Sequence, residues 1–361
     1  MSSISRIGSR NKSVSHGSVS QQRARFKQLG LSMIELMIAI TIGLLLVAGI
    51  TLLIARQSST RAEFEKASRK IENGRYAMQI LKDEIEHAGF YDQFTDIGPA
   101  PATLPDPCET DVTKMATALP LALQGYDSLA LINSVVSCLA DGNHKPGTDM
   151  LVVRHADLTA PIAVASAVAG QPYIQTGQTG PGSAIASVIG SGPNTALFKL
   201  QDKSGNIASL RKYIVRLYFI SPCNTPAGAA CTASDDAGNP TPTLKRLDLG
   251  VNAAGATAFS MVPLAEGIEN LQLDYGLDSA AADGSPHTYT TAPATSADWS
   301  NVMAIRVNIL ARNNDATGGY IDKKSYTLGL ATTIPAFNDA YKRHVFTELV
   351  RATNPSGRRE Q

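Results

Sequence analysis

The chain has 361 residues, of which 43% are hydrophobic, 17% charged and 6% aromatic. This content excludes a chain that is disordered throughout, and the length is sufficient for a packed core. The formal net charge of +1 hides an asymmetry: residues 1–30 hold six basic and no acidic residues, whereas the remainder has 26 basic against 31 acidic residues. The opposite signs indicate that the two parts occupy different surroundings, and an acidic remainder argues against nucleic-acid binding.

A long apolar run follows the basic segment. Residues 31–55 read LSMIELMIAITIGLLLVAGITLLIA, and the 20 residues from Leu36 to Ala55 carry no charge. At about 1.5 Å per residue such a helix spans roughly 30 Å, the thickness of the hydrocarbon core of a bilayer. The run is longer than the apolar part of a secretory signal peptide. We therefore predict a transmembrane helix over 31–55, with the basic residues 1–30 on the cytoplasmic side.

Glu35 is the exception within this run. An ionised carboxylate in an apolar helix is costly unless it is paired or reaches the membrane surface, so it indicates a function. The alternative is that the side chain reaches the cytoplasmic surface from one turn inside the helix.

The segment Gly30-Leu31-Ser32-Met33-Ile34-Glu35 resembles the type III signal of prepilins, which has a basic leader ending in Gly and a Glu as the fifth mature residue. The resemblance implies that prepilin peptidase removes residues 1–30 by cutting between Gly30 and Leu31, and that Leu31 is then N-methylated. It also implies that Glu35 pairs with the amino terminus of a neighbouring subunit and fixes the register of a filament. Leu31 stands where Phe is commoner, a mild departure at an apolar site.

The pattern becomes amphipathic over residues 56–89. The apolar positions recur at spacings of three and four, which places them on one helical face. They are Phe64, Ala67, Ile71, Gly74, Met78, Leu81, Ile85 and Ala88. Gly89 is a suitable stop because Gly readily adopts the left-handed conformation at a helix end. The pattern predicts one helix over about 32–88, whose second half lies against a sheet.

Residues 90–361 have the pattern of a β-rich domain with long loops. Several segments alternate apolar and polar residues, as antiparallel strands with one buried face do. The candidate strands are Ser128–Val135, Met150–Ala156, Ala196–Leu200, Tyr213–Ile220, Leu244–Leu249, Leu271–Tyr275, Val302–Ala311, Ser325–Ala331 and Arg343–Leu349. The Gly/Pro/Ser/Ala-rich stretches Ala160–Pro193 and Ser279–Asp298 are interpreted as long loops or small insertions, where specific contacts are expected.

Several segments of this part are similar to those of PilW-type minor pilins. They are Asn73–Ala77, His87–Phe90, Tyr213–Ile220, Glu266–Leu271, Asp274–Gly276, Trp299 with Val302–Arg312, and Arg343–Arg351. The J-type minor pseudopilin of type II secretion is a close relative in plan. The resemblance implies an α+β fold of the type IV pilin kind, a ladle in which a long N-terminal helix, transmembrane in its first half, packs on an antiparallel head.

All four cysteines lie in the segment expected outside the cytoplasm, where an even count favours disulfides. Of three possible pairings, proximity in the sequence favours Cys108–Cys138 and Cys223–Cys231. A metal site would require close ligand spacing such as C-x-x-C, which the sequence lacks.

The remaining polar residues suggest no chemistry. Asp274, Asp278 and Asp283 supply the oxygen ligands that calcium prefers, but their spacing is not that of an EF-hand, and a solvated acidic loop is favoured. Catalytic and nucleotide-binding motifs are missing from the sequence. We therefore expect no catalytic residue, no cofactor and no metal.

The resemblance implies a minor pilin that initiates assembly of a type IV pilus and supports twitching motility. Its partners would be other minor pilins, the major pilin, prepilin peptidase and the inner-membrane assembly machinery. It would reside in the inner membrane with a periplasmic head and then in the pilus, at its tip. The alternatives are a type II secretion pseudopilin, a tip adhesin and a membrane-tethered periplasmic enzyme.

Overall fold

The computed structural model describes residues 30, 32–94, 96–280, 282–331 and 333–360. Its helices are α1 Met33–His87, α2 Val112–Met115, α3 Asp235–Gly238, α4 Ser296–Ser300 and α5 Thr353–Arg359, with 3-10 turns η1 Ala116–Ala118, η2 Asp141–Asn143 and η3 Val164–Ser166. Its strands are β1 Leu123–Tyr126, β2 Met150–Ala156, β3 Pro172–Gln178, β4 Ile185–Ser191, β5 Leu210–Ser221, β6 Thr243–Val251, β7 Thr257–Glu266, β8 Ile268–Leu277, β9 Thr288–Thr290, β10 Val302–Arg312 and β11 Arg343–Arg351.

The chain forms two compact units, and helix α1 belongs to both of them. The first unit ends at Ser59, and the second begins at Thr60. The first unit contains the N-terminal part of α1, and the second contains the rest of α1 and every strand. We describe each unit by itself, and we call the second the head. A long apolar helix followed by a β-rich antiparallel domain is the predicted α+β class.

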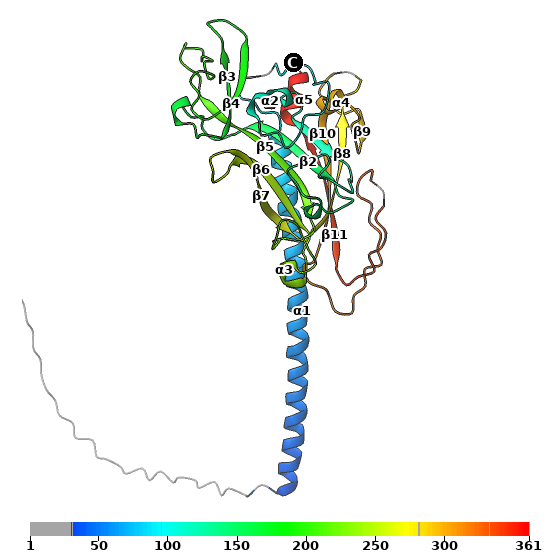
Figure 1. Cartoon of the computed structure of the whole chain (residues 1–361). Helices are drawn as coiled ribbons and strands as arrows, with labels where there is room; N and C mark the ends of the chain where they lie inside the picture. The colour runs from blue at the N-terminus through cyan, green and yellow to red at the C-terminus, as the bar shows by residue number, and fades with distance from the viewer. Residues whose placement is uncertain (1–29, 31, 95, 281, 332, 361) are drawn as a thin grey trace, which may run out of the picture. The chain divides into compact units, whose positions relative to one another are not determined.

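The head has two antiparallel sheets (Figure 1). The larger sheet has the order β1-β2-β5-β3-β4, and β6 and β7 continue from β5. Strand β5 is long enough to pair with β3 at residues 210–212 and with β6 at residues 216–221. The smaller sheet has the order β11-β10-β8-β9.

The main core forms where the head part of α1 meets one face of each sheet. Leu81 and Ile85 of α1, and Ala88 directly after the helix, are completely buried there. The larger sheet contributes Leu151, Val153, Tyr218 and Ile220, among others, and the smaller sheet contributes Leu271, Ile305, Val307 and Ile309, among others. The two sheets are therefore held together through the helix that both of them cover.

Asp149 joins the two sheets directly. Its backbone N–H donates to Leu271 O at 2.9 Å, and its carboxylate accepts from the Leu273 N–H at 2.7 Å. Asp149 immediately precedes β2, whereas both partners belong to β8. This contact positions the two sheets in addition to the apolar core.

The C-terminal end of α1 is capped by the last helix of the chain. The Asn354 side chain donates to the carbonyls of Glu86, His87 and Ala88 at 3.1 to 3.4 Å. Arg358 donates to Gly89 O at 2.9 Å. Gly89 has a φ of +74°, which confirms the predicted glycine stop. Helix ends leave carbonyls without partners, and α5 supplies donors for them.

A second core lies on the opposite face of the larger sheet. Met150, Val152 and Ala156 of β2 alternate with the residues that face α1, and they pack beneath the segment 90–139. Cys108, Met115, Ile132 and Val136 are among the residues of that segment that cover them. The larger sheet is thus buried on both faces here, which explains why β2 is buried along its whole length.

Six of the nine predicted strands are confirmed. Met150–Ala156 matches β2 at both ends, and the other five fall within β5, β6, β8, β10 and β11. The stretch Ala160–Pro193, expected as a loop or small insertion, folds into the hairpin β3–β4. Its small and polar residues obscured the alternation that marks a strand.

Three predicted strands are wrong. Ser128–Val135 forms turns because the Asp141 carboxylate accepts the N–H groups of Ile132 and Asn133, each at 2.7 Å. Ala196–Leu200 begins within a turn, in which Asn194 accepts from the N–H groups of Leu197 and Phe198. Ser325–Ala331 contributes one isolated bridge, between Tyr326 and Ile334. In each case side-chain or loop contacts replace the strand pairing that apolar residues alone suggested.

The amphipathic face of α1 is confirmed only from Gly74 onward. Gly74, Met78, Leu81 and Ile85 are buried, whereas Phe64 is 74% exposed. Near Phe64, the segment between β10 and β11 contacts the helix through polar groups. Glu63 accepts hydrogen bonds from Thr317 and Lys342 of that segment. The predicted face is therefore exposed at Phe64 and only partly covered at Ala67 and Ile71.

Gly74 permits a close approach between α1 and the smaller sheet. A Cβ at this position would lie 2.1 Å from Cε2 of Phe346 in β11. We expect Gly74→Ala to lower the free energy of unfolding by about 1 kcal/mol. Overpacking costs about 1–3 kcal/mol and exceeds the gain in helix propensity of about 1 kcal/mol. The fluorescence of Trp299, the one tryptophan of the chain, would report urea unfolding of the full-length protein in nonionic detergent.

The double variant Gly74→Ala with Phe346→Leu provides the control. A smaller side chain at 346 should relieve the overlap, so the two substitutions should not be additive. A Gly74→Ala variant that is as stable as the wild type would contradict the steric explanation.

A buried ion cluster anchors the long segment between β10 and β11. Arg343 has no exposed side-chain surface and pairs with Glu269, Asp322 and Asp339. Burial opposes ionisation of Asp322, but hydrogen bonds from Tyr326 and Arg343 outweigh it and lower its pKa. Hydrogen bonds from Arg343 are the largest influence on Asp339 and also lower its pKa. Asp322 and Asp339, both in this segment, are thus held by ion pairs with the first residue of β11.

This cluster predicts acid sensitivity. Both aspartates have pKa values below their ordinary value of 3.8, so the unfolded chain takes up protons first as the pH falls. The stability that they contribute is complete above that ordinary value and is lost below it. We expect the urea midpoint to fall steeply once the pH drops below about 4, and Asp339→Asn to make the fall shallower.

Asp315→Asn, at an exposed position of the same segment, is the matched control and should keep the wild-type pH profile. Identical profiles for Asp339→Asn and wild type would exclude this cluster as the source of acid sensitivity.

Candidate assembly site

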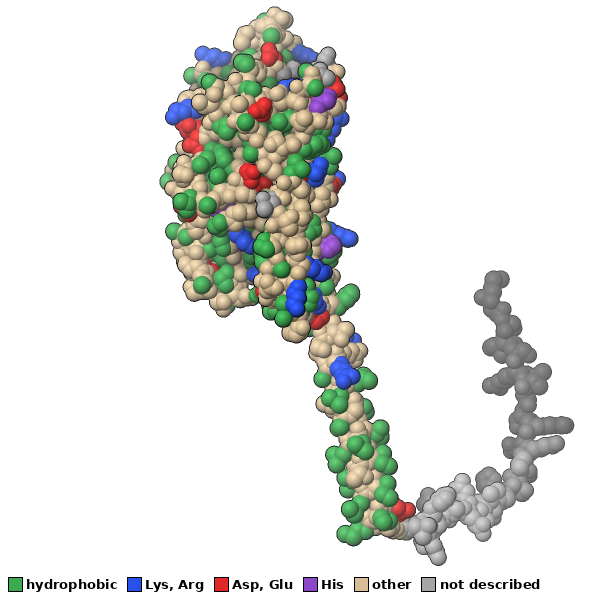
Figure 2. Space-filling model, turned by 90° about the vertical axis from the view of Figure 1, so that its right-hand side faces the viewer, with side chains coloured by type: hydrophobic (Ala, Val, Ile, Leu, Met, Phe, Trp, Pro, Cys, Tyr) green, Lys and Arg blue, Asp and Glu red, His purple; other side chains and the backbone are tan. Residues whose placement is uncertain are grey.

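The first unit exposes an apolar helix surface. Between Met33 and Ile54 nearly every large hydrophobic side chain is about half or more exposed. Hydrophobic side chains cover this part of the helix on the face that Figure 2 shows. The helix is long and apolar enough to cross a membrane. Such a surface requires lipid or other apolar helices around it, because water would leave its hydrophobic area unburied.

Glu35 lies at the start of this helix and binds its own backbone. Its Oε2 accepts from the Ser32 N–H at 3.0 Å, and the Ser32 hydroxyl accepts from the Ile34 N–H at 3.4 Å. Ser32 precedes the first helical residue, so the Glu35 side chain satisfies the backbone N–H of the residue before the helix, while the Ser32 hydroxyl accepts from Ile34 rather than from Glu35. The Ser-x-x-Glu spacing is visible in the sequence, but the sequence-based interpretations of Glu35 were limited to pairing with a neighbouring subunit or reaching the cytoplasmic membrane surface.

Gly30 is exposed and lies three residues before the first residue of the helix. A side chain at this position would meet nothing within 4 Å. Leu31 and the leader residues 1–29 lie outside the described residues. The cleavage after Gly30 and the methylation of Leu31 therefore stay predictions, which analysis of the mature N-terminus would test.

Both predicted disulfides are present in the head. Cys108–Cys138 closes a span of 30 residues and belongs to the second core, while Cys223–Cys231 closes a span of eight. In the chain-entropy model, closing the longer loop contributes about 3–4 kcal/mol of stability. The first bond ties together the segment that covers the outer face of the larger sheet.

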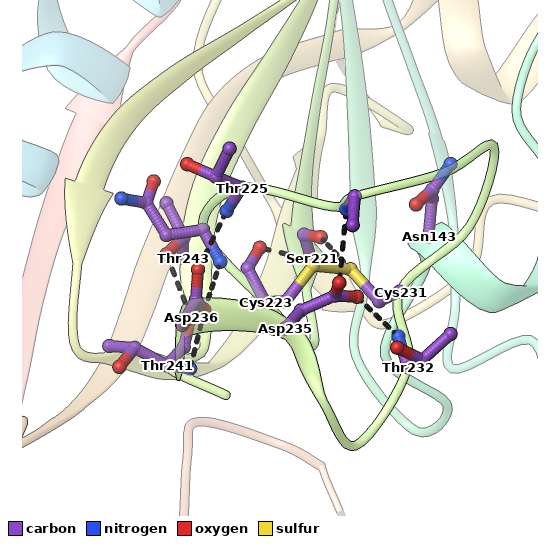
Figure 3. The surroundings of a disulfide bond; sticks show 12 residues. Asn143, Ser221, Cys223, Thr225, Cys231, Thr232, Asp235, Asp236, Thr241 and Thr243 are labelled. Atoms are coloured by element: carbon purple, nitrogen blue, oxygen red, sulfur yellow. Dashed lines mark hydrogen bonds between the residues drawn. A yellow bond between two sulfur atoms is a disulfide. The ribbon is translucent and has the colours of Figure 1, made fainter. Parts of the chain in front are cut away.

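Two adjacent aspartates organise the loop around Cys223–Cys231 (Figure 3). Asp235 accepts from the N–H groups of Ala227 and Thr232, and Asp236 accepts from those of Asn224, Thr225 and Thr241. Cys223, Cys231 and Asp235 lie close enough together to suggest a metal site. However, the two sulfurs are bonded to each other, and both Asp235 oxygens accept backbone hydrogen bonds. The three residues therefore stabilise the loop rather than offer free metal ligands.

The three aspartates considered for calcium do not converge. Asp274 is buried beside Arg306 and accepts from the Leu330 N–H, so it fastens the segment between β10 and β11. Asp278 and Asp283 do approach each other, with His287 as the third member. Asp278 already accepts from two backbone N–H groups and from Arg359. The oxygen-only set that calcium requires is therefore not assembled by these three aspartates.

Comparison with known families gives two matches. Residues 25–51 match a model of the prokaryotic N-terminal methylation motif, and residues 231–354 match a model described as type IV pilus-assembly protein W. The first match contains Gly30, Leu31 and Glu35, and the second contains β6 to β11. No curated protein and no solved structure matches the chain.

Proposed function

We propose that this chain, a type IV pilus minor pilin of the PilW family, acts without catalysis by starting the assembly of a pilus. In this proposal it joins other minor pilins in the inner membrane, forms a priming complex for the major pilin, and stays at the tip. Family members of this kind are structural parts of the pilus. The observation that carries the proposal is Glu35, a carboxylate at the start of an exposed apolar helix.

Processing would come first. Prepilin peptidase would cut between Gly30 and Leu31 at the cytoplasmic face of the membrane, and Leu31 would be methylated. An uncovered Gly30 supports this step because a protease needs an accessible, unhindered bond. Residues 31–55 would then lie in the membrane and later in the filament core, with 56–89 as the amphipathic continuation and 90–361 as a periplasmic head.

Glu35 would set the register during assembly. The carboxylate can accept a hydrogen bond from its own Ser32 N–H and also attract the amino terminus of a neighbouring helix. In an apolar bundle an unpaired charge is strongly unfavourable, so one axial position would be preferred over others. Because this chain has Glu35, it can sit beneath another subunit and receive its amino terminus.

The exposed side of the head helix would supply a further contact. Phe64 is 74% exposed, and it forms an apolar groove with Ala67 and Ile71. An uncovered aromatic residue next to other apolar residues is typical of protein interfaces. Neighbouring pilins are the expected occupants.

Mass spectrometry of the protein from cells that contain prepilin peptidase tests the processing step. We expect an N-terminal peptide that begins with methylated Leu31, and an uncut chain for Gly30→Val because the bulky side chain blocks the peptidase. An intact leader in the wild-type protein would remove the chain from the pilin class.

Glu35→Gln tests the assembly step. The amide oxygen can still accept from Ser32 N–H, so maturation and membrane insertion should be normal while surface pili and twitching are largely lost. Ser32→Ala keeps the carboxylate and should retain piliation. Equal defects in both variants would contradict a specific role for the charge of Glu35 in assembly. Lost secretion with normal pili would favour a pseudopilin instead.

A further inference from the structure

A cavity of about 310 Å³ lies between the segment 103–118 and strands β2 and β5. This volume is in the range of small-molecule sites. Its apolar walls include Leu104, Pro105, Met115 and Val215, and two polar groups from the strands, Arg154 and Tyr213, also line it. The cavity is on the face of the larger sheet opposite α1, where the second core lies.

The strand register brings the two polar groups together. Arg154 of β2 is directly opposite Val215 of β5, and Tyr213 is two residues along β5 on the same face. Diagonal neighbours in an antiparallel pair are within reach of long side chains. One strand pair therefore presents a guanidinium and a phenol to the same space.

Arg154 is a buried cation without a carboxylate. It is 2% exposed and donates to Leu121 O at 3.0 Å and to the Gln124 side chain at 2.8 Å. No carboxylate among the residues that the structure describes lies within 4.0 Å of its nitrogens. Buried charges are normally paired, and Arg343 of this same chain has three carboxylates around it.

Tyr213 is a buried donor without an acceptor. The residue has no exposed surface, and its hydroxyl has no hydrogen-bond partner in the described part of the chain. Burial raises its pKa to about 12, against the opposing effect of Arg154, so the hydroxyl keeps its proton. Buried hydroxyls nearly always have a partner, which makes this one available to an incoming acceptor.

The acidic residues of the cavity wall are used within their own segment. Asp106 accepts from the Cys108 N–H, and Glu109 accepts from the Asp111 N–H. Lys114 lies 3.8 Å from Glu109 and from Asp111. The charge of Arg154 is therefore left for a group that enters the cavity.

We propose that this cavity binds a small organic carboxylate with an apolar body. The carboxylate would pair with Arg154 and accept from Tyr213, while the apolar body would contact Leu104, Met115 and Val215. This site goes beyond the assembly role and does not depend on it, and every residue that lines it lies outside the family matches.

Calorimetry of the full-length protein in a nonionic detergent tests the proposal with sodium benzoate as the probe. Benzoate should bind, and benzamide, which has the same shape without the charge, should bind at least about tenfold more weakly. Tyr213→Phe removes no hydrogen bond of the free protein, so it should fold normally and weaken benzoate about tenfold. Arg154→Gln should abolish binding.

Tyr91→Phe is the matched control because it also deletes a buried hydroxyl without a partner, outside this cavity, and it should bind benzoate like the wild type. A capped Ala-Glu-Ala peptide is a second probe, which distinguishes a carboxylate on a protein side chain from one on a free acid. Binding of benzoate or of the peptide supports the site if Tyr213→Phe weakens it. The proposal fails if neither probe binds, if benzamide equals benzoate, or if Tyr213→Phe leaves the affinity unchanged.

Discussion

Burial of one apolar stripe, from Gly74 of α1 to Ala88 directly after the helix, is the interaction on which the head depends. Within the described part of the head the two sheets have no strand pairing with each other; they meet on this stripe and are also joined through Asp149. Each large apolar side chain that they bury contributes about 1.5–3 kcal/mol relative to exposure. The absence of a side chain at Gly74 lets Phe346 approach the helix, and α5 completes the hydrogen bonds at its end.

Helix α1 has two different surfaces. The exposed apolar surface of the first unit is suited to anchoring, whereas the buried surface in the head contributes to folding. In the head, protein covers the apolar residues of the helix from Gly74 onward; in the first unit, large apolar side chains stay exposed and polar side chains are few. An exposed surface of that kind is stable in lipid or against other helices, so it suits a subunit that leaves one for the other. Glu35 is compatible with both surroundings because its own backbone partly satisfies it.

The outer face of the larger sheet has a different character. There the cover is a loop-rich segment, closed by Cys108–Cys138, rather than a helix. Loops cover a sheet less completely than a helix does, and a cavity remains where Arg154 and Tyr213 project from the strands. Arg343 differs from Arg154 because three carboxylates surround it. The buried charge of Arg343 thus stabilises the fold, whereas that of Arg154 remains available to a ligand in our proposal.

The sequence by itself determined the features that depend on local pattern. The uncharged run after Gly30, the position of Glu35, the apolar spacing from Gly74 to Ala88 and the alternation in β10 each reflect a fixed helical or strand period, so they identify the anchor, the long helix and most strands. Proximity along the chain was also sufficient for both disulfides.

Only the tertiary structure decided the features that depend on distant partners. Ser128–Val135 turns because Asp141 captures its backbone, Phe64 stays uncovered because the sheets meet the helix later, and Arg154 is unpaired because its strand faces a loop segment without a free carboxylate. Such outcomes follow from which groups meet across the fold. The linear pattern records the period of an element, but it does not record what lies opposite each face.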